Sequence, residues 1–211
     1  MTTGCDRRRQ RLFHPRSGRA VLLALDHGLS DGMIPGLSGL AGMVDLARER
    51  EVQGLVLNKG QARSLAPDIG PWRNLIVQLS GGTKHGLPPY ATSVVCGVHE
   101  ALRLGADAVS AHLNIGNDLE DRMLADFGML TDEAHQLGLP VVAVVLARGP
   151  QIVNEQDPSL VSHCVRVGGE LGADVVCVPF SGHVESFAEA VAASPCPVLM
   201  AGGPALPDLE M

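Results

Sequence analysis

The six residues Leu-Gly-Ala-Asp-Ala-Val at positions 104–109 return almost unchanged as Leu-Gly-Ala-Asp-Val-Val at positions 171–176. In both copies, a helix is predicted to end at the leucine, the glycine to form a turn, and a strand to begin after the aspartate. Two near-identical junctions, lying two βα units apart, indicate a chain built from repeated βα units. Such a repeat favours a barrel over an open sheet.

Seven short apolar runs extend this pattern along the chain. Each is rich in leucine or β-branched residues, is hydrophobic on both faces, and ends in a polar or glycine-rich cluster. Strands that are apolar on both faces are typical of a parallel sheet covered by helices. Helical patterns lie between most of the runs, which begin about 20 to 35 residues apart, the length of a βα unit. The predicted strands are residues 21–25, 54–57, 75–79, 108–112, 141–146, 175–178 and 197–200.

We therefore expect an α/β fold, a TIM-type (β/α) barrel formed by residues 1–211 as a single domain. A TIM barrel has eight strands and about 250 residues, whereas the 211 residues here supply about seven strands. The expectation is a barrel that is truncated at its C-terminal end. Three interpretations stay open: the barrel is open, another chain completes it, or the gene product is shortened. An open barrel exposes two strand edges, so we expect a homo-oligomer.

Composition excludes several classes of function. The net charge is −7, aromatic residues make up 3%, and the only basic run is at positions 7–11, so no nucleic-acid partner is expected. The five cysteines are odd in number and scattered, with no CxxC pair, which argues against a disulfide framework and a zinc site. The apolar run at 21–25 is too short for a signal peptide or a membrane span, so a cytoplasmic protein is expected.

Polar groups follow the predicted strands, and in such barrels the chemistry lies at the carboxyl ends of the strands. Asp26 could be a general base or a loop cap, and His112 could transfer protons or be a hydrogen-bonded core residue. Lys59 and Arg148 could bind a carboxylate or phosphate, or form structural ion pairs. The glycines Gly202 and Gly203 could present N–H groups to a phosphate or form a plain turn, and Cys177, Ser181 and Gly182 lie at the end of the sixth strand.

These strand ends resemble the class I aldolases of the archaeal fructose-bisphosphate aldolase type, and above all the 2-amino-3,7-dideoxy-D-threo-hept-6-ulosonate synthases (DeoC/FbaB-like proteins). The similarity runs almost end to end. The matching segments are residues 11–13, 17–19, 26–28, 59–60, 79–80, 100–116, 148–150 and 201–204.

The resemblance implies a mechanism, from which this sequence departs. Members of the family form a Schiff base between a lysine on strand six and a ketone. An aspartate at the position of Asp26 and a tyrosine on strand five move protons, and glycine turns after strands seven and eight hold phosphate. Here Cys177 occupies the lysine position and Leu146 the tyrosine position, and the last turn would lie beyond Met211. A thiol forms no iminium, so a Schiff base would need Lys59 or Lys84.

Three hypotheses follow. The protein is a repurposed enzyme that acts on a small, phosphorylated carbonyl compound through Asp26, His112 and Arg148, with Cys177 as a candidate nucleophile. It is instead a non-catalytic or decayed homologue that binds a ligand or partners an intact aldolase. Or it is an aldolase whose catalytic groups have shifted, with Lys59 as the nucleophile. Aromatic amino acid or secondary metabolite biosynthesis is the expected setting, and neither a cofactor nor a metal is expected.

Overall fold

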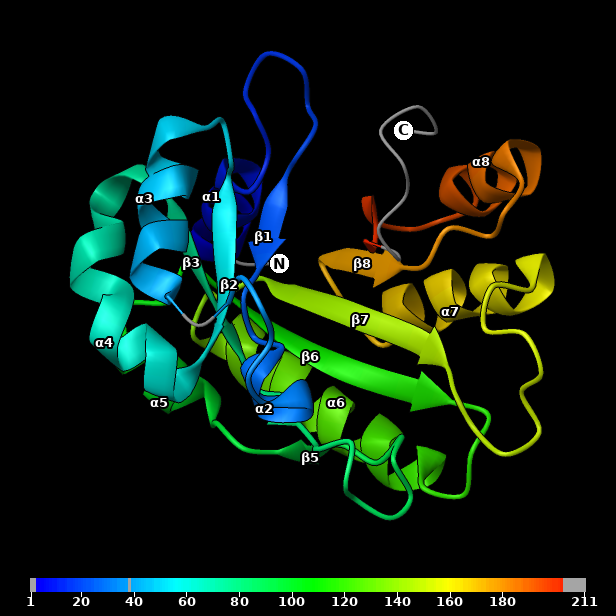
Figure 1. Ribbon diagram of the computed structural model, residues 1–211. Coiled ribbons are helices and arrows are strands. Elements are labelled where there is room, and N and C mark those ends of the chain that lie inside the picture. The colour runs from blue at the N-terminus through cyan, green and yellow to red at the C-terminus, as the bar shows by residue number, and fades with distance from the viewer. Residues whose placement is uncertain (1–2, 38, 203–211) are drawn as a thin grey trace.

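The computed structural model describes residues 3–37 and 39–202. Seven parallel strands form one sheet in the order β1-β2-β3-β6-β7-β8-β9, and β4 and β5 form a separate antiparallel pair. The sheet curls into an open half-barrel with helices on its outer side (Figure 1). The TIM-type architecture and the seven strands expected from the sequence are thus confirmed.

The strands are β1 (Leu22–Ala24), β2 (Gly54–Asn58), β3 (Asn74–Gln78), β4 (Ser80–Gly81), β5 (Ser93–Val94), β6 (Ala108–Ile115), β7 (Val141–Ala147), β8 (Val175–Val178) and β9 (Val198–Met200). The helices are α1 (Thr3–Arg11), α2 (Gly28–Asp31), α3 (Leu40–Glu49), α4 (Lys59–Ile69), the 3-10 helix η1 (Gly70–Trp72), α5 (Val98–Arg103), α6 (Glu120–Gln136), α7 (Pro158–Glu170) and α8 (Val184–Ala192).

Alternation along each strand divides its side chains between two environments. In β6, the odd-numbered residues from Val109 to Ile115 belong to the large core between sheet and helices. Ala108, at the start of the even-numbered series, belongs to a second cluster inside the barrel, with Ile76, Val142 and Val175. Since side chains alternate between faces, His112 and Asn114 follow Ala108 onto the interior face.

The outer helices bury one apolar face each. In α6 the buried positions are Met123, Phe127, Leu130, Thr131 and Ala134, which recur at helical spacing. Helix α7 is capped by Asp157, whose carboxylate accepts the backbone N–H of Ser159 at 2.9 Å, and Pro158 is the first residue of the helix. No helix among the described residues is both long and apolar enough to span a membrane.

The repeated segment performs the same task twice. Gly105 and Gly172 both have a positive φ, of 88° and 89°, which suits a residue without a side chain. The Asp107 carboxylate accepts the backbone N–H of Leu75 at 3.1 Å, and the Asp174 carboxylate accepts that of Val141 at 2.9 Å. Each aspartate therefore lies just before one strand, β6 or β8, and binds the start of the neighbouring strand of the sheet, β3 or β7.

Helix α1 closes the amino-terminal end of the barrel. Its basic run is only partly solvated, because Arg8 donates to the carbonyl of Gly138 at 2.9 Å and Arg11 to Asp107 at 2.8 Å. Leu12, which follows the helix, is 1% exposed and packs in the interior cluster. The sequence of this helix is strongly polar, so its hydrophobicity does not indicate that it packs against the barrel.

Candidate functional site

The candidate site lies on the interior face near the carboxyl ends of the strands. His112 of β6 is in register with Val144 of β7, which is in register with Cys177 of β8. The three residues therefore form one row across the sheet. Two strand spacings separate the backbones of His112 and Cys177, about 9–10 Å.

His112 is the titratable centre of this row. Burial lowers its pKa, the negative charge of Asp26 opposes that shift, and the charges of Arg148 and His27 add to it. Its backbone N–H donates to the Ser80 hydroxyl at 2.7 Å. The imidazole is therefore neutral near neutral pH, the form that can accept a proton.

Asp26 lies where β1 has ended, with its side chain 15% exposed and an oxygen 3.9 Å from Nδ1 of His27. The side-chain amide of Asn58, the last residue of β2, donates to the carbonyl of Asp26 at 2.6 Å. This bond fixes the backbone that carries the carboxylate. Asp26 and His112, both predicted from the sequence, are thus close enough for their charges to interact.

A buried polar layer supports the row, and sequence reasoning did not identify it as part of the site. The Ser110 hydroxyl bonds the Gln78 side chain, whose amide donates to the hydroxyl and to the carbonyl of Ser80, both at 3.1 Å. The sequence does carry one indication: Ser110 and His112 are two residues apart in an apolar strand, so their side chains lie on the same face of the sheet.

Asn114 is a further interior group. Its amide donates to the carbonyl of Tyr90 at 2.6 Å, while its buried Oδ1 has no hydrogen-bond partner among the described residues. Buried acceptors without partners are uncommon in proteins. This oxygen is available to a donor group of a ligand.

Cys177 and Leu146 make the other side of the site apolar. Burial raises the pKa of the Cys177 thiol to about 11, so the nucleophilic thiolate is scarce at neutral pH. Leu146, 9% exposed, is in register with Asn114. These surroundings argue against Cys177 as a nucleophile.

The predicted anion-binding residues follow β7, β8 and β9. Arg148 is already paired, because its Nε lies 3.0 Å from a carboxylate oxygen of Glu155. Ser181 is buried and its hydroxyl bonds that of Ser186 at 3.1 Å. Gly182 has a φ of 81°, and a side chain at Gly182 or Gly202 would meet no atom within 4 Å. Gly203 lies outside the described residues.

Lys59 is not brought to this site. It is the first residue of α4, and its Nζ lies 3.3 Å from Glu100, which also pairs with Arg63 at 3.1 Å. The chain's other lysine, Lys84, donates to the carbonyl of Asp31 at 3.0 Å. Neighbouring Asn58, whose side chain reaches Asp26, is the residue on the interior side.

Residues 20–210 match the sequence model of the DeoC/LacD family of aldolases. The chain is 40% identical over 197 residues to 2-amino-4,5-dihydroxy-6-oxo-7-(phosphonooxy)heptanoate synthase of Streptomyces griseus, covering 93% of this chain and 72% of the relative. It is 34% identical over 192 residues to 2-amino-3,7-dideoxy-D-threo-hept-6-ulosonate synthase of Halobacterium salinarum, covering 91% and 72%.

Solved structures show the same similarity. A Schiff-base-forming fructose-1,6-bisphosphate aldolase superposes with a TM-score of 0.88 at 30% identity, covering 98% of this chain and 83% of that one. An archaeal fructose-1,6-bisphosphate aldolase, solved with its catalytic lysine covalently bound to the carbinolamine intermediate, has a TM-score of 0.87 at 30% identity and the same coverage.

Proposed function

Because this chain belongs to the DeoC/LacD family of aldolases, we propose that it acts on a small, phosphorylated carbonyl compound without a Schiff-base lysine. The observation that carries the proposal is the position of its two lysines. Lys59 pairs with Glu100 on the outer side of the sheet, and Lys84 bonds a loop carbonyl. Cys177 holds the row position beside Val144 on the interior face.

Proton transfer is the chemistry that remains for the interior groups. A carbonyl substrate loses a proton from the adjacent carbon to a base and gains one at oxygen when an enol forms. In this proposal Asp26 is the base, and His112 exchanges the second proton with the oxygen. The lowered pKa of His112 supports this assignment, since a neutral imidazole both accepts and donates protons.

Phosphate recognition is assigned to Arg148, Ser181, Gly182, Gly202 and Gly203. Support comes from the names of the relatives, which specify a phosphonooxy product and a bisphosphate substrate. Arg148 would exchange Glu155 for the phosphate, because guanidinium groups bind both anions in two-pronged geometry. Oδ1 of Asn114 would accept a hydrogen bond from a hydroxyl group of the substrate.

A second function, ligand binding without turnover, is favoured by the apolar side of the site. The protonated thiol of Cys177 and the buried Leu146 supply neither a nucleophile nor a proton donor of ordinary acidity. A protein of this kind would bind a phosphorylated metabolite or partner an intact aldolase. For either function we propose that residues 1–211 act as a single domain in the cytoplasm, as a homo-oligomer and in biosynthesis.

Turnover separates the two functions. The purified chain is incubated with fructose 1,6-bisphosphate and with a phosphorylated deoxyketose, and is assayed for carbon–carbon cleavage and, in D₂O, for exchange of the hydrogen on the carbon next to the carbonyl. Asp26→Asn is assayed beside it, with the control Asp45→Asn, which alters an exposed carboxylate of α3. Asp26→Asn should lower kcat by about 100-fold or more, and Asp45→Asn should leave it unchanged. If the wild-type protein binds these compounds but neither cleaves them nor exchanges that hydrogen, the catalytic proposal fails and the binding function stands.

A further inference from the structure

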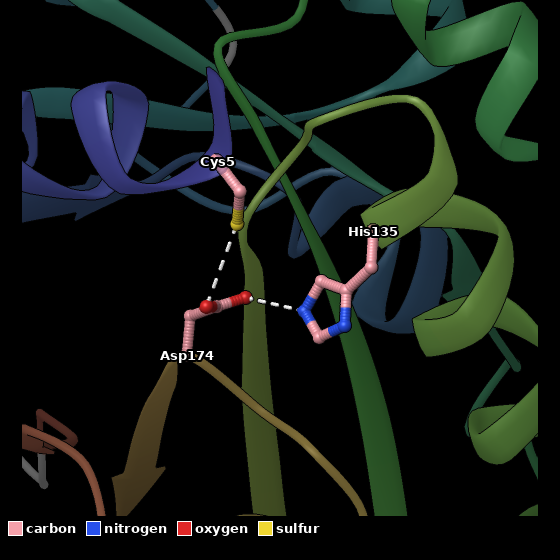
Figure 2. Close-up of side chains that lie close together, drawn as sticks. All are labelled: Cys5, His135 and Asp174. Atoms are coloured by element: carbon pink, nitrogen blue, oxygen red, sulfur yellow. Dashed lines mark hydrogen bonds and ion pairs between the residues drawn. The ribbon is translucent and has the colours of Figure 1, made fainter. Parts of the chain in front are cut away.

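A second cluster of functional side chains lies at the opposite end of the barrel from the site described above. Cys5 of α1, His135 near the end of α6 and Asp174 before β8 each contribute an atom to a group whose members lie within 4.8 Å of one another (Figure 2). They come from three separate parts of the sequence, which is why no motif predicts them.

We propose that Cys5, His135 and Asp174 bind a zinc ion, which fastens α1 to the amino-terminal end of the barrel. Thiolate, imidazole and carboxylate are the ligands that Zn²⁺ takes in proteins, and three protein ligands plus a water complete a tetrahedral site. The proposal is independent of the proposed function, because it involves the other end of the strands.

The distances suit a small tetrahedral ion. Ligand atoms about 2.0–2.3 Å from a central zinc lie about 3.4–3.7 Å from each other. Sγ of Cys5 is 3.5 Å from Oδ1 of Asp174, and Nε2 of His135 is 2.9 Å from Oδ2. The three ligand atoms all lie within 4.8 Å of one another, so side-chain shifts of about an ångström bring them to this separation.

A second bond already orients the carboxylate. Oδ2 of Asp174 accepts the backbone N–H of Val141 at 2.9 Å and would keep that bond while Oδ1 binds the ion. Hydrogen bonds of this kind orient metal ligands in proteins and strengthen binding. His135 is 30% exposed, which gives an ion access from solvent.

The repeat in the sequence supplies an internal comparison. Asp107, the counterpart of Asp174, has its charge neutralised by Arg11 at 2.8 Å. At Asp174, whose side chain is fully buried, the neighbours are a thiol and an imidazole instead. A buried carboxylate is stabilised by an opposite charge, and a metal ion held between these neighbours would supply one to Asp174.

Charge balance favours the ion. Binding displaces the proton of the Cys5 thiol to solvent and leaves a thiolate and a carboxylate opposite a dication, so the buried site is neutral. Burial raises the pKa of the Cys5 thiol to about 12, the charge of Asp174 adds to that shift, and the charge of Arg9 opposes it. The dication itself must therefore supply the charge that holds the thiolate.

Metal binding by the full chain tests the proposal. The protein is freed of metal with a chelator, then titrated with Zn²⁺ and, separately, with Co²⁺, whose visible spectrum reports tetrahedral geometry and thiolate ligation. The variants are Cys5→Ser and His135→Gln. The controls are Cys96→Ser, a cysteine outside the group whose charged neighbours are Glu100 and Lys59, and His99→Gln, whose histidine lies 3.6 Å from Glu133 on the surface.

We expect about one equivalent of Zn²⁺ per wild-type chain and a thiolate-to-cobalt band. Cys5→Ser should abolish that band, and each cluster variant should weaken Zn²⁺ binding by about 100-fold or more, with both controls unchanged. Far-UV circular dichroism establishes that each variant is folded. The proposal is overturned if folded wild-type protein binds no Zn²⁺, or if Cys5→Ser retains the band and the affinity.

Discussion

The two aspartates of the repeat should differ in their contribution to stability, although they occupy equivalent positions. We compare Asp174→Ala with Asp107→Ala in the presence of a chelator, so that no metal contributes. Both substitutions remove the acceptor of a backbone N–H at or next to the start of a strand, that of Val141 in β7 or of Leu75 in β3. The difference between the variants therefore reports the surroundings of each carboxylate.

Burial determines the expected magnitudes. The Asp174 side chain is fully buried and lies 2.9 Å from His135, so its loss leaves the buried N–H and the imidazole without their acceptor and costs about 3–5 kcal/mol. Asp107 is 26% exposed and its partner Arg11 is 56% exposed, so water replaces much of what is lost and the cost is about 1–2 kcal/mol.

Urea unfolding at neutral pH, followed by circular dichroism, measures both losses. Equal slopes against urea would show that the variants expose the same surface on unfolding. We expect the Asp174→Ala midpoint to fall well below that of Asp107→Ala. Equal losses, or a larger loss for Asp107→Ala, would refute the link between burial and the role of Asp174.

Three more outcomes are expected. The pKa of His112 is lower in the folded than in the unfolded state, so stability should fall as the pH decreases through the unfolded pKa of about 6.5. Urea midpoints measured across this pH range should fall less for His112→Gln than for the wild type. Gly168→Ala should lower the free energy of unfolding by about 1–3 kcal/mol, because the new methyl would lie 2.8 Å from Val176. Gly42→Ala should raise it by about 0.4–1 kcal/mol, because Gly42 is helical and has open space around it; identical thermal shifts for the two variants would contradict this. Cys177 should react slowly with iodoacetamide at neutral pH and rapidly once the protein is unfolded, and fast labelling of the folded protein would show that its thiol is not held in the protonated form.

The strands were predictable because each is apolar on both faces, and this pattern can be recognised in the sequence without knowing the tertiary contacts. The ends were less predictable. The run at 108–112 continues to Ile115, since the polar Asn114 points into the barrel and remains in register with Leu146. In the sequence, a polar residue that points into the barrel looks like a loop residue that follows a strand, so composition alone predicts the end of the strand too early.

The site was predictable in part for the same reason. Asp26 and His112 follow apolar residues on the interior face, and their charges interact. The place of Lys59 after a strand predicts a site residue, but the chain turns into α4 at that residue and Glu100 of α5 binds its side chain. The group of Cys5, His135 and Asp174 depends on where α1 docks, and no local pattern encodes that contact.

Reduction with borohydride tests the central claim, that this aldolase-family barrel works without a Schiff base. The folded protein is incubated with dihydroxyacetone phosphate or fructose 1,6-bisphosphate, reduced, and analysed by intact mass and peptide mapping, beside an aldolase that forms the imine. We predict an adduct on that aldolase and none on this chain. A substrate-sized adduct at Lys59 or Lys84 would contradict the claim and show that the covalent chemistry has moved to another lysine.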